Sequence, residues 1–498
     1  MVQQLPAIIV IAPLVISFFI FFTGWWHKWI AYPLAVTAMS ICLLSSVGIL
    51  NSVIVDGTIS YWLGGWQPPW GIEYRIDHLN AIMLVLVSAL GLLAAVHAKK
   101  SVARELPGKT TLFWSLFILM ITGLLGICIT GDLFNLFVLL EVASLAGYAL
   151  ISMGEKNAVY AGFRYIVIGT IGASFYLLGV GYLYITCGSL NMTDLSQLLS
   201  KLYHSKPVLA GFAFILIGLS IKMALFPLHG WLPDAYACAP SAVSVAVAPL
   251  VTKVMAYVIV RMIFSVFGAE YAISILRVTD VMIWIGTLAI LFGAVMALSQ
   301  SDYKRMLSYV VIAEIGYIVG GIGVANTIAL KGAVFHIIND AMMVACLFLV
   351  AGLVMYKTHG HRIDDFKGMF KTMPITAAVL TVGALAVIGV PPTCGFFSKW
   401  YLLLGGIKAG RWVFVAALLV STLINVALFF RIFDKGLYSH AQQDVRSDKA
   451  AGDAPHSPEA PLSMLIPAVV LALTILLVGI FNQVIMNKVI RFAVPSGL

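Results

Sequence analysis

The sequence predicts an all-α integral membrane protein with about fourteen transmembrane helices. Of its 498 residues, 61% are hydrophobic and only 10% are charged, whereas soluble domains carry about 25% charged residues. Apolar stretches of about 18–25 residues, the length that crosses a hydrocarbon core of about 30 Å, recur along the chain. These stretches are continuous and do not alternate with polar residues, so they predict helices and not the strands of a barrel.

The predicted helices follow one another along almost the whole chain. They lie near residues 5–23, 29–50, 78–98, 110–129, 131–152, 158–186, 208–229, 238–265, 277–298, 304–324, 328–356, 373–404, 409–433 and 462–486. The first run lacks the basic segment and the cleavage site of a signal peptide, so we expect it to be a retained helix. The longest polar segments are a Trp, Gly and Pro-rich outer loop at 61–77 and an inner loop at 439–461, which we expect to be a mobile linker.

The distribution of basic residues predicts the orientation of the chain. The connections predicted to lie inside carry 17 Lys and Arg residues and those predicted to lie outside carry 10, which places both termini outside. The formal net charge of +9 is dispersed over helix ends and forms no basic patch, so it does not indicate nucleic-acid binding. The six cysteines are isolated and form no CxxC pair, so we expect no disulfide framework and no metal or iron–sulfur site.

Six charged residues lie inside apolar runs, where a charge costs about 2.5–3.5 kcal/mol on insertion scales. They are Glu141, Lys222, Lys253, Glu314, Asp340 and Lys399. One buried ion pair is as consistent with helix packing as with transport. Six such residues in one chain favour a path for protons or ions, with His336 and Ser244 among the polar side chains that could order water along it.

Prolines predict interruptions in two of these helices, the seventh and the twelfth. Pro227 follows Lys222 by five residues, and Pro391, Pro392 and Gly395 come just before Lys399. Paired broken helices in two halves of a chain indicate a transporter site. Glu141 precedes Lys222 by 222 − 141 = 81 residues and Glu314 precedes Lys399 by 399 − 314 = 85.

This spacing predicts two five-helix repeats of inverted topology, helices 4–8 and 9–13. The expected divisions are residues 1–109 with three helices, 110–265 with the first repeat, 270–435 with the second repeat, and 436–498 with the inner loop and the last helix.

Several segments resemble a known family. They are TGDLFNLFVLLEVAS (130–144), KMALFPLHGWLPDAYACAPSAVS (222–244), SDYKRMLSYV (301–310), FHIIND (335–340) and MPITAAVLTVGALAVIGVPPTCGFFSKW (373–400). They resemble the proton-translocating, antiporter-like subunits shared by Mrp-type Na⁺/H⁺ antiporters, respiratory complex I and membrane-bound hydrogenases. The resemblance covers helices 4–13, and it implies the same fourteen-helix fold with inverted repeats and both termini outside.

The resemblance also implies roles for single residues. Glu141 is similar to the acid that pairs with the lysine of the first broken helix, here Lys222, and senses a neighbouring subunit. Lys253 and Lys399 are similar to the central and terminal lysines, and His336 to a histidine of the eleventh helix. His229, and with it Asp234 and Ser244 of the same motif, is expected to support this path.

Two features depart from the family pattern. Where the family usually has HxxNHAxxK, this chain has Asp340 and Val344 in place of the second His and of the Lys, and Glu314 stands where Ser, His or Gln is common. The central part of the path is therefore expected to be rewired through these acids, adapted to another cation, or weakened.

The expected function is that of a subunit in a hetero-oligomeric Mrp-type monovalent cation (Na⁺)/H⁺ antiporter of the cytoplasmic membrane. Only residues 487–498 follow the last apolar run, which favours the short D-type subunits over those with a long lateral helix. One alternative is the same module in a redox-driven complex of the complex I or hydrogenase type. Another is a non-conducting scaffold. No segment resembles a flavin, iron–sulfur or quinone site, so we expect no cofactor in this chain and no enzymatic chemistry of its own.

Overall fold

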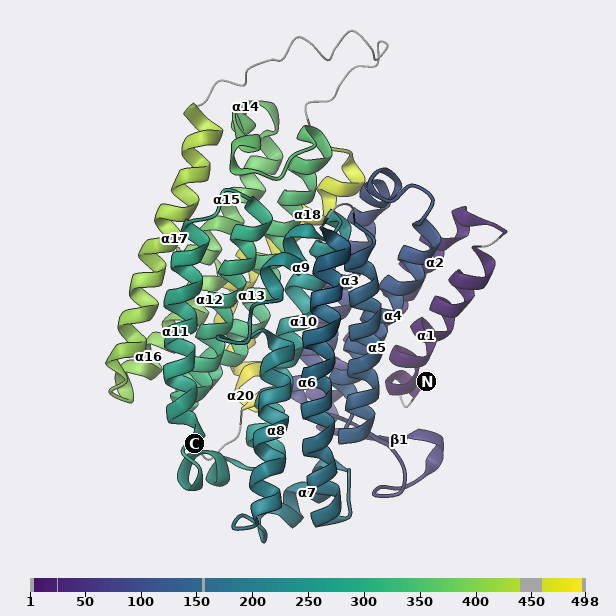
Figure 1. The fold of residues 1–498 in the computed structure, drawn as a ribbon, viewed down its shortest axis with the longest axis vertical. Coiled ribbons are helices and arrows are strands. Elements are labelled where there is room, and N and C mark those ends of the chain that lie inside the picture. Colours follow the sequence, from purple (N-terminus) through teal and green to yellow (C-terminus); the bar gives the residue numbers. More distant parts are fainter. Residues whose placement is uncertain (1–3, 25, 155–156, 439–458, 495–498) are drawn as a thin grey trace.

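The structure is a computed structural model that describes residues 4–24, 26–154, 157–438 and 459–494. These residues form a bundle of long, roughly parallel helices (Figure 1). Thirteen helices in this part of the chain are long and apolar enough to cross a membrane. The pair α15 and α16 supplies one further, interrupted crossing. The predicted all-α membrane fold is confirmed, whereas the inverted relation of the two repeats stays a prediction.

The helices keep the predicted order, and most bounds differ from the predicted ones by a few residues. The first half contains α1 (Leu5–Thr23), α2 (Ala31–Asp56), α3 (His78–Glu105), α4 (Thr110–Ile129), α5 (Leu133–Ser152), α6 (Ala158–Cys187), α7 (Met192–Leu199), α8 (Lys206–Met223), α9 (Leu232–Cys238) and α10 (Ser241–Arg261). The second half contains α11 (Val278–Leu298), α12 (Tyr303–Gly323), α13 (Thr327–Thr358), α14 (Met369–Thr372), α15 (Pro374–Ile388), α16 (Cys394–Lys408), α17 (Trp412–Tyr438), α18 (Leu462–Ile480), α19 (Asn482–Ile485) and α20 (Arg491–Ala493).

A small β-hairpin that overlaps the predicted outer loop at 61–77 was not predicted. Strands β1 (Ile59–Trp62) and β2 (Glu73–Ile76) pair antiparallel, with Ile59 opposite Ile76. The strands are rich in aromatic and β-branched residues, which favour strands, but they are too short to stand out from the tryptophans, glycines and prolines around them. Asp77 ends the hairpin and caps α3 by accepting hydrogen bonds from the amides of Leu79 and Asn80.

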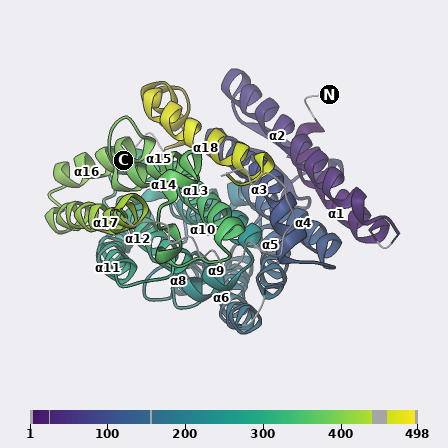
Figure 2. The ribbon, with the colours of Figure 1, turned by 90° about the horizontal axis from the view of Figure 1, so that it is seen from above.

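The core of the bundle lies on α10 and α13. Seen from above, these two helices occupy the middle, with α1 and α2 at one edge and α16 and α17 at the opposite edge (Figure 2). Their apolar segments and that of α12 are almost entirely buried, whereas the outer helices expose many large apolar side chains. Close packing needs small residues between membrane helices: a Cβ added at Gly218 in α8 would lie 2.5 Å from the Gly172 carbonyl in α6.

The two described ends of the chain lie on the face that carries the hairpin. The Tyr61 hydroxyl donates to Gln4 Oε1 at 2.9 Å, and the ring of Phe492 lies 5.1 Å from that of His78 at the start of α3. The described part of the chain therefore begins and ends at the same face, as an even number of crossings requires. Residues 439–458 of the predicted inner linker lie outside the described residues.

Candidate functional site

The first broken helix consists of α8 and α9. α8 ends at Met223, and Ala224 takes a left-handed conformation with φ of 60°. At the end of α8 the Ile221 carbonyl accepts hydrogen bonds from the amide of Ala224 at 3.1 Å and from the indole Nε1 of Trp231 at 3.0 Å. Pro227 lies in the exposed segment between the two helices. Lys222 is thus held in the last turn of α8, one residue before the chain leaves the helix.

Lys222 meets three polar side chains of α5. Its ammonium lies 3.2 Å from Glu141 Oε1, 2.9 Å from Ser144 Oγ and 3.1 Å from the Tyr148 hydroxyl. The lysine is buried, whereas 24% of the Glu141 side chain is exposed on the outside of the bundle. We call Glu141 and Lys222 the first charged group. Ser144 and Tyr148 were missed in the sequence, although positions three and seven residues after Glu141 fall on the same helix face.

The second broken helix consists of α15 and α16, with Pro391 and Pro392 between them. The Lys399 ammonium donates to the Val387 carbonyl, one of the carbonyls at the end of α15. Gly395 lies where α16 passes α15: an added Cβ would meet the Ala386 carbonyl oxygen at 2.0 Å. The interruption therefore supplies an acceptor for Lys399, and the absence of a side chain at 395 lets the two half-helices approach.

Lys399, Glu314 and His336 form a buried cluster, which we call the terminal group. Glu314 Oε1 lies 3.2 Å from the Lys399 ammonium, and Glu314 Oε2 lies 2.7 Å from His336 Nε2. The other ring nitrogen of His336 lies 2.9 Å from Ser398 Oγ. The ring of Tyr317 lies 4.5 Å from the Lys399 ammonium. Glu314 thus joins the histidine to the lysine through its two oxygens.

Lys253 in α10 and Asp340 in α13 form the central pair. The ammonium lies 2.9 Å from Asp340 Oδ2, and their side chains are 1% and 0% exposed. Apart from this ion pair, neither the ammonium nor the carboxylate has a hydrogen-bond partner among the described residues. Asp340 follows His336 by one helical turn on α13, so the central pair and the terminal group share a helix face.

The three groups follow one another across the bundle, from α5 and α8 through α10 and α13 to α12 and α16. A cavity of about 10 Å³, room for about one water molecule, borders Lys222 and is lined on the α10 side by Val251 and Met255. Each membrane lysine of the sequence analysis therefore has a carboxylate beside it, and two of the three lysines adjoin helix breaks.

The three supporting residues lie outside these groups. The ring of His229 packs against Phe226 and Phe292, and Ser244 Oγ donates to the Tyr236 carbonyl at 2.9 Å. Asp234 accepts hydrogen bonds from Arg164 at 2.8 Å and from Arg305. These contacts hold the segment after the first helix break in place.

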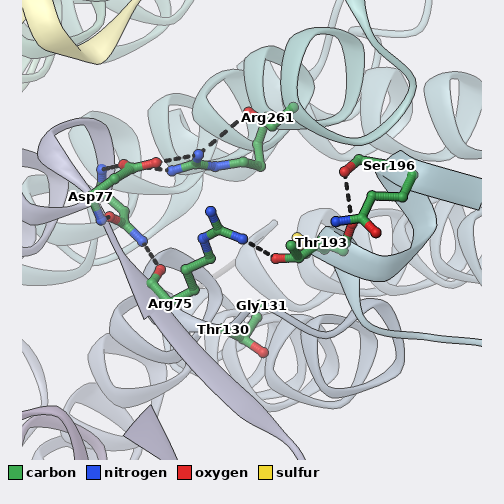
Figure 3. A pocket seen from close by; sticks show the side chains of 11 residues that line it. Arg75, Asp77, Thr130, Gly131, Thr193, Ser196 and Arg261 are labelled. Carbon is green, nitrogen blue, oxygen red and sulfur yellow. Dashed lines mark hydrogen bonds and ion pairs between the residues drawn. The ribbon is translucent and has the colours of Figure 1, made fainter. Parts of the chain in front are cut away.

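A separate polar pocket of about 390 Å³ opens near the hairpin. In it Arg261 reaches toward Asp77, whose two oxygens it contacts at 2.6 and 2.8 Å, and Arg75 reaches toward Thr193 (Figure 3). Burial tends to raise the pKa of the Asp77 carboxyl, but Arg261 and the capping amides outweigh burial and hold this pKa below its usual value. The pocket and its ion pair were not foreseen from the sequence.

Fold and site together define a polytopic membrane protein with paired charges in its interior, the arrangement expected of an ion-translocating subunit. Among the described residues, no cluster of His, Cys, Asp and Glu could hold a metal ion. The chain belongs to the family described as NADH:quinone oxidoreductase/Mrp antiporter, transmembrane, whose model matches residues 130–425.

Its relatives carry two kinds of name. NADH-quinone oxidoreductase subunit N of Desulforudis audaxviator is 43% identical over 506 aligned positions, covering 100% of both chains. The D-type subunit of the Na⁺/H⁺ antiporter of Alkalihalophilus pseudofirmus is 32% identical over 78% of each chain, and that of Bacillus subtilis is 27% identical over 90% of this chain and 88% of its own.

Two solved structures share the fold. A chain of the membrane-bound sulfane sulfur reductase, an archaeal respiratory membrane complex, superposes with a TM-score of 0.88 at 29% identity over 98% of this chain and 97% of its own. A chain of the Mrp complex from Dietzia sp. DQ12-45-1b gives a TM-score of 0.87 at 23% identity over 99% of this chain and 97% of its own, a likeness of fold alone.

Proposed function

We propose that this chain is a proton-translocating subunit of a multisubunit membrane complex and that protons move between the first charged group, the central pair and the terminal group. The observation that carries the proposal is that each of three buried lysines lies within 3.2 Å of a carboxylate. Charges inside a membrane protein are costly and mark ion or proton routes.

The pairs provide a means of moving protons without a cofactor. A buried lysine holds its proton firmly while a carboxylate lies beside it, and less firmly when that carboxylate moves away. Lys222 and Lys399 adjoin interrupted helices, where small rearrangements cost fewer backbone hydrogen bonds than in a continuous helix. A shift at one break would change how firmly the lysine beside it binds its proton, and would favour transfer of that proton toward the next group.

The partly exposed Glu141 supports a role within a larger assembly. Its side chain lies at the surface of α5, which also exposes Phe134, Val138 and Leu145. A carboxylate at this depth is expensive against lipid. We therefore expect a membrane subunit of the same complex to cover this face of α5.

Two kinds of complex are supported by the relatives. The relative with 43% identity along its whole length is a subunit of an NADH-quinone oxidoreductase, and this favours a redox-driven complex whose electron chemistry lies on other subunits. The D-type antiporter subunits, at 27–32% identity, support the second candidate, a Na⁺/H⁺ antiporter of the Mrp type. We further propose a place in the cell membrane with both termini outside, which labelling of single cysteines placed at Gln4 and Phe492 would test.

The test of translocation uses Glu141→Ala and Lys399→Ala in the intact complex, in everted vesicles with a dye that reports ΔpH. We expect both variants to assemble and to lose proton movement. Acidification driven by an electron donor identifies the redox complex, and collapse of ΔpH on adding Na⁺ identifies the antiporter. Normal proton movement in both fully assembled variants would show that the chain is a non-conducting scaffold.

A further inference from the structure

One turn of α12 holds both ends of α9, the second half of the first broken helix. The ammonium of Lys304 donates to the carbonyl of Ala239, the capping residue that directly follows α9. The neighbouring Arg305 binds the carboxylate of Asp234 in the first turn of α9. Since Lys304 and Arg305 are consecutive residues near the start of α12, α9 and α12 are joined at two points.

Lys304 is placed unusually for a residue at a helix end. From the sequence it counts as an ordinary basic residue of an inner connection, but in the structure it is only 2% exposed. A lysine that deep must have partners to offset its lost hydration. The Ala239 carbonyl is one, and the carboxylates of Glu105 and Asp302 lie within electrostatic range.

An acid from a third helix holds the other side of the same junction. Glu105, the last residue of α3, accepts a hydrogen bond at 2.8 Å from the amide of Ser241, where α10 begins. Its second oxygen accepts from Ser101 at 2.6 Å. The short link from Ala239 to Ser241 thus lies between a buried cation of α12 and an acid of α3, and α10 leads from it to Lys253.

α12 connects this junction to the far end of the site. Glu314 follows Lys304 by ten residues, roughly 15 Å along the same helix, and α12 is buried along nearly its whole length. A helix packed on all sides moves as a unit more readily than it bends. A displacement of α9 would therefore reach Glu314, which holds both His336 and Lys399.

We propose that Lys304 is a positioning residue that couples the first helix break to the terminal group, by fixing α9 to the helix that carries Glu314. The inference rests on the proposed function, because it assigns the coupling between the two broken helices of the proton path. Arg305 and Glu105 complete the attachment of the junction, and we call the three residues the junction clamp.

The experiment compares Lys304→Met, Lys304→Arg and Lys100→Met in the purified intact complex. Lys100 is an exposed lysine near the same end of α3 as Glu105, so it controls for loss of a positive charge at this face. Amide hydrogen exchange is measured over residues 232–245, and proton translocation is measured after reconstitution into liposomes. We expect Lys304→Met to speed exchange by about tenfold, in the range of losing a charged partner at a helix end, and to lose most translocation.

The conservative and control variants make the result specific. We expect Lys304→Arg to restore slow exchange and most translocation, and Lys100→Met to change neither. If Lys304→Met fails to assemble, Arg305→Gln removes the other contact with α9 and is expected to produce the same two effects.

Two outcomes would overturn the inference. Unchanged exchange in Lys304→Met would show that the junction does not depend on the clamp, and fast exchange with normal translocation would show that the clamp only stabilises the fold. Neither outcome is the failure of the proposed function, which would instead appear as normal translocation in Glu141→Ala and Lys399→Ala.

Discussion

Replacement of Asp340 by Asn gives the sharpest test of the central pair. Asp340 and Lys253 are both almost completely buried and lie 2.9 Å apart, so the change leaves an ammonium without its counter-charge in the middle of the bundle. Removing one partner of a buried ion pair costs about 3–5 kcal/mol. We therefore expect Asp340→Asn to lower the free energy of unfolding by about 3–5 kcal/mol.

The double variant Asp340→Asn, Lys253→Met separates stability from transport. Replacing both members of a buried pair by uncharged residues of similar size is often neutral, so the double variant is expected to regain most of the stability. It is not expected to regain translocation, since no proton-binding group is left at the centre of the path.

The measurements are the thermal unfolding of the purified complex and ΔpH formation in reconstituted liposomes, for the wild type, both single variants and the double variant. The reasoning is refuted if Asp340→Asn is as stable as the wild type. It is also refuted if the double variant translocates protons normally, because the central pair would then lie off the path.

Three further predictions concern single contacts. Gly395→Ala places a methyl group against the Ala386 carbonyl and is expected to lower thermal stability by about 1–3 kcal/mol through overpacking. It should also reduce translocation by displacing α16. The control Gly181→Ala meets open space and should change neither thermal stability nor ΔpH formation. Tyr148→Phe removes the hydroxyl that accepts a hydrogen bond from the Lys222 ammonium and is expected to cost about 1.5–3 kcal/mol in thermal unfolding. A value within error of the wild type would show that this hydroxyl does not hold the lysine. Asp77→Asn keeps a good cap for α3, because Asn and Asp cap helices about equally well, but it removes the charge that pairs with Arg261 and is expected to cost at least about 1 kcal/mol at pH 7. The folded pKa of Asp77 lies below its unfolded value of about 3.9. The difference in stability between the wild type and Asp77→Asn should therefore be complete above about pH 4 and vanish as the pH falls through the folded pKa. A difference that persists in stronger acid would contradict this linkage.

The sequence was sufficient for the helices and for the residues that are expensive in lipid. Continuous apolar runs predict membrane helices because the backbone must form its hydrogen bonds within the segment when it lies in hydrocarbon. Lys222, Lys253 and Lys399 stand out because a charge inside a membrane is costly. Prolines lie in the interruptions after α8 and α15, as expected of a residue that lacks a backbone hydrogen-bond donor, although Pro13, Pro249 and Pro467 lie inside continuous helices.

Pairings between helices and short local features were harder to predict. Nothing in the local sequence states that Lys253 meets Asp340, since the two residues lie on helices whose packing is set by the whole bundle. Lys304 looks like a surface charge because its neighbours in sequence are polar, but the packing of distant segments, among them the end of α9, buries it. The hairpin was missed because four-residue strands carry little periodic signal.

The unusual residues Asp340, Val344 and Glu314 share one electrostatic effect, which is to match the number of acids on the proposed path to the number of lysines there. In the described structure the three membrane lysines of the proposed path face three acids, Glu141, Asp340 and Glu314, each within 3.2 Å of its lysine. Asp340 and Glu314 are the acids that the family resemblance marks as unusual, and without them Lys253 and Lys399 would each be a buried charge without a carboxylate beside it. With Val344 in place of a fourth lysine, the charges of this set balance. We therefore expect Asp340→His alone to impair proton movement along the proposed path, because it removes one acid and leaves the three lysines facing only two.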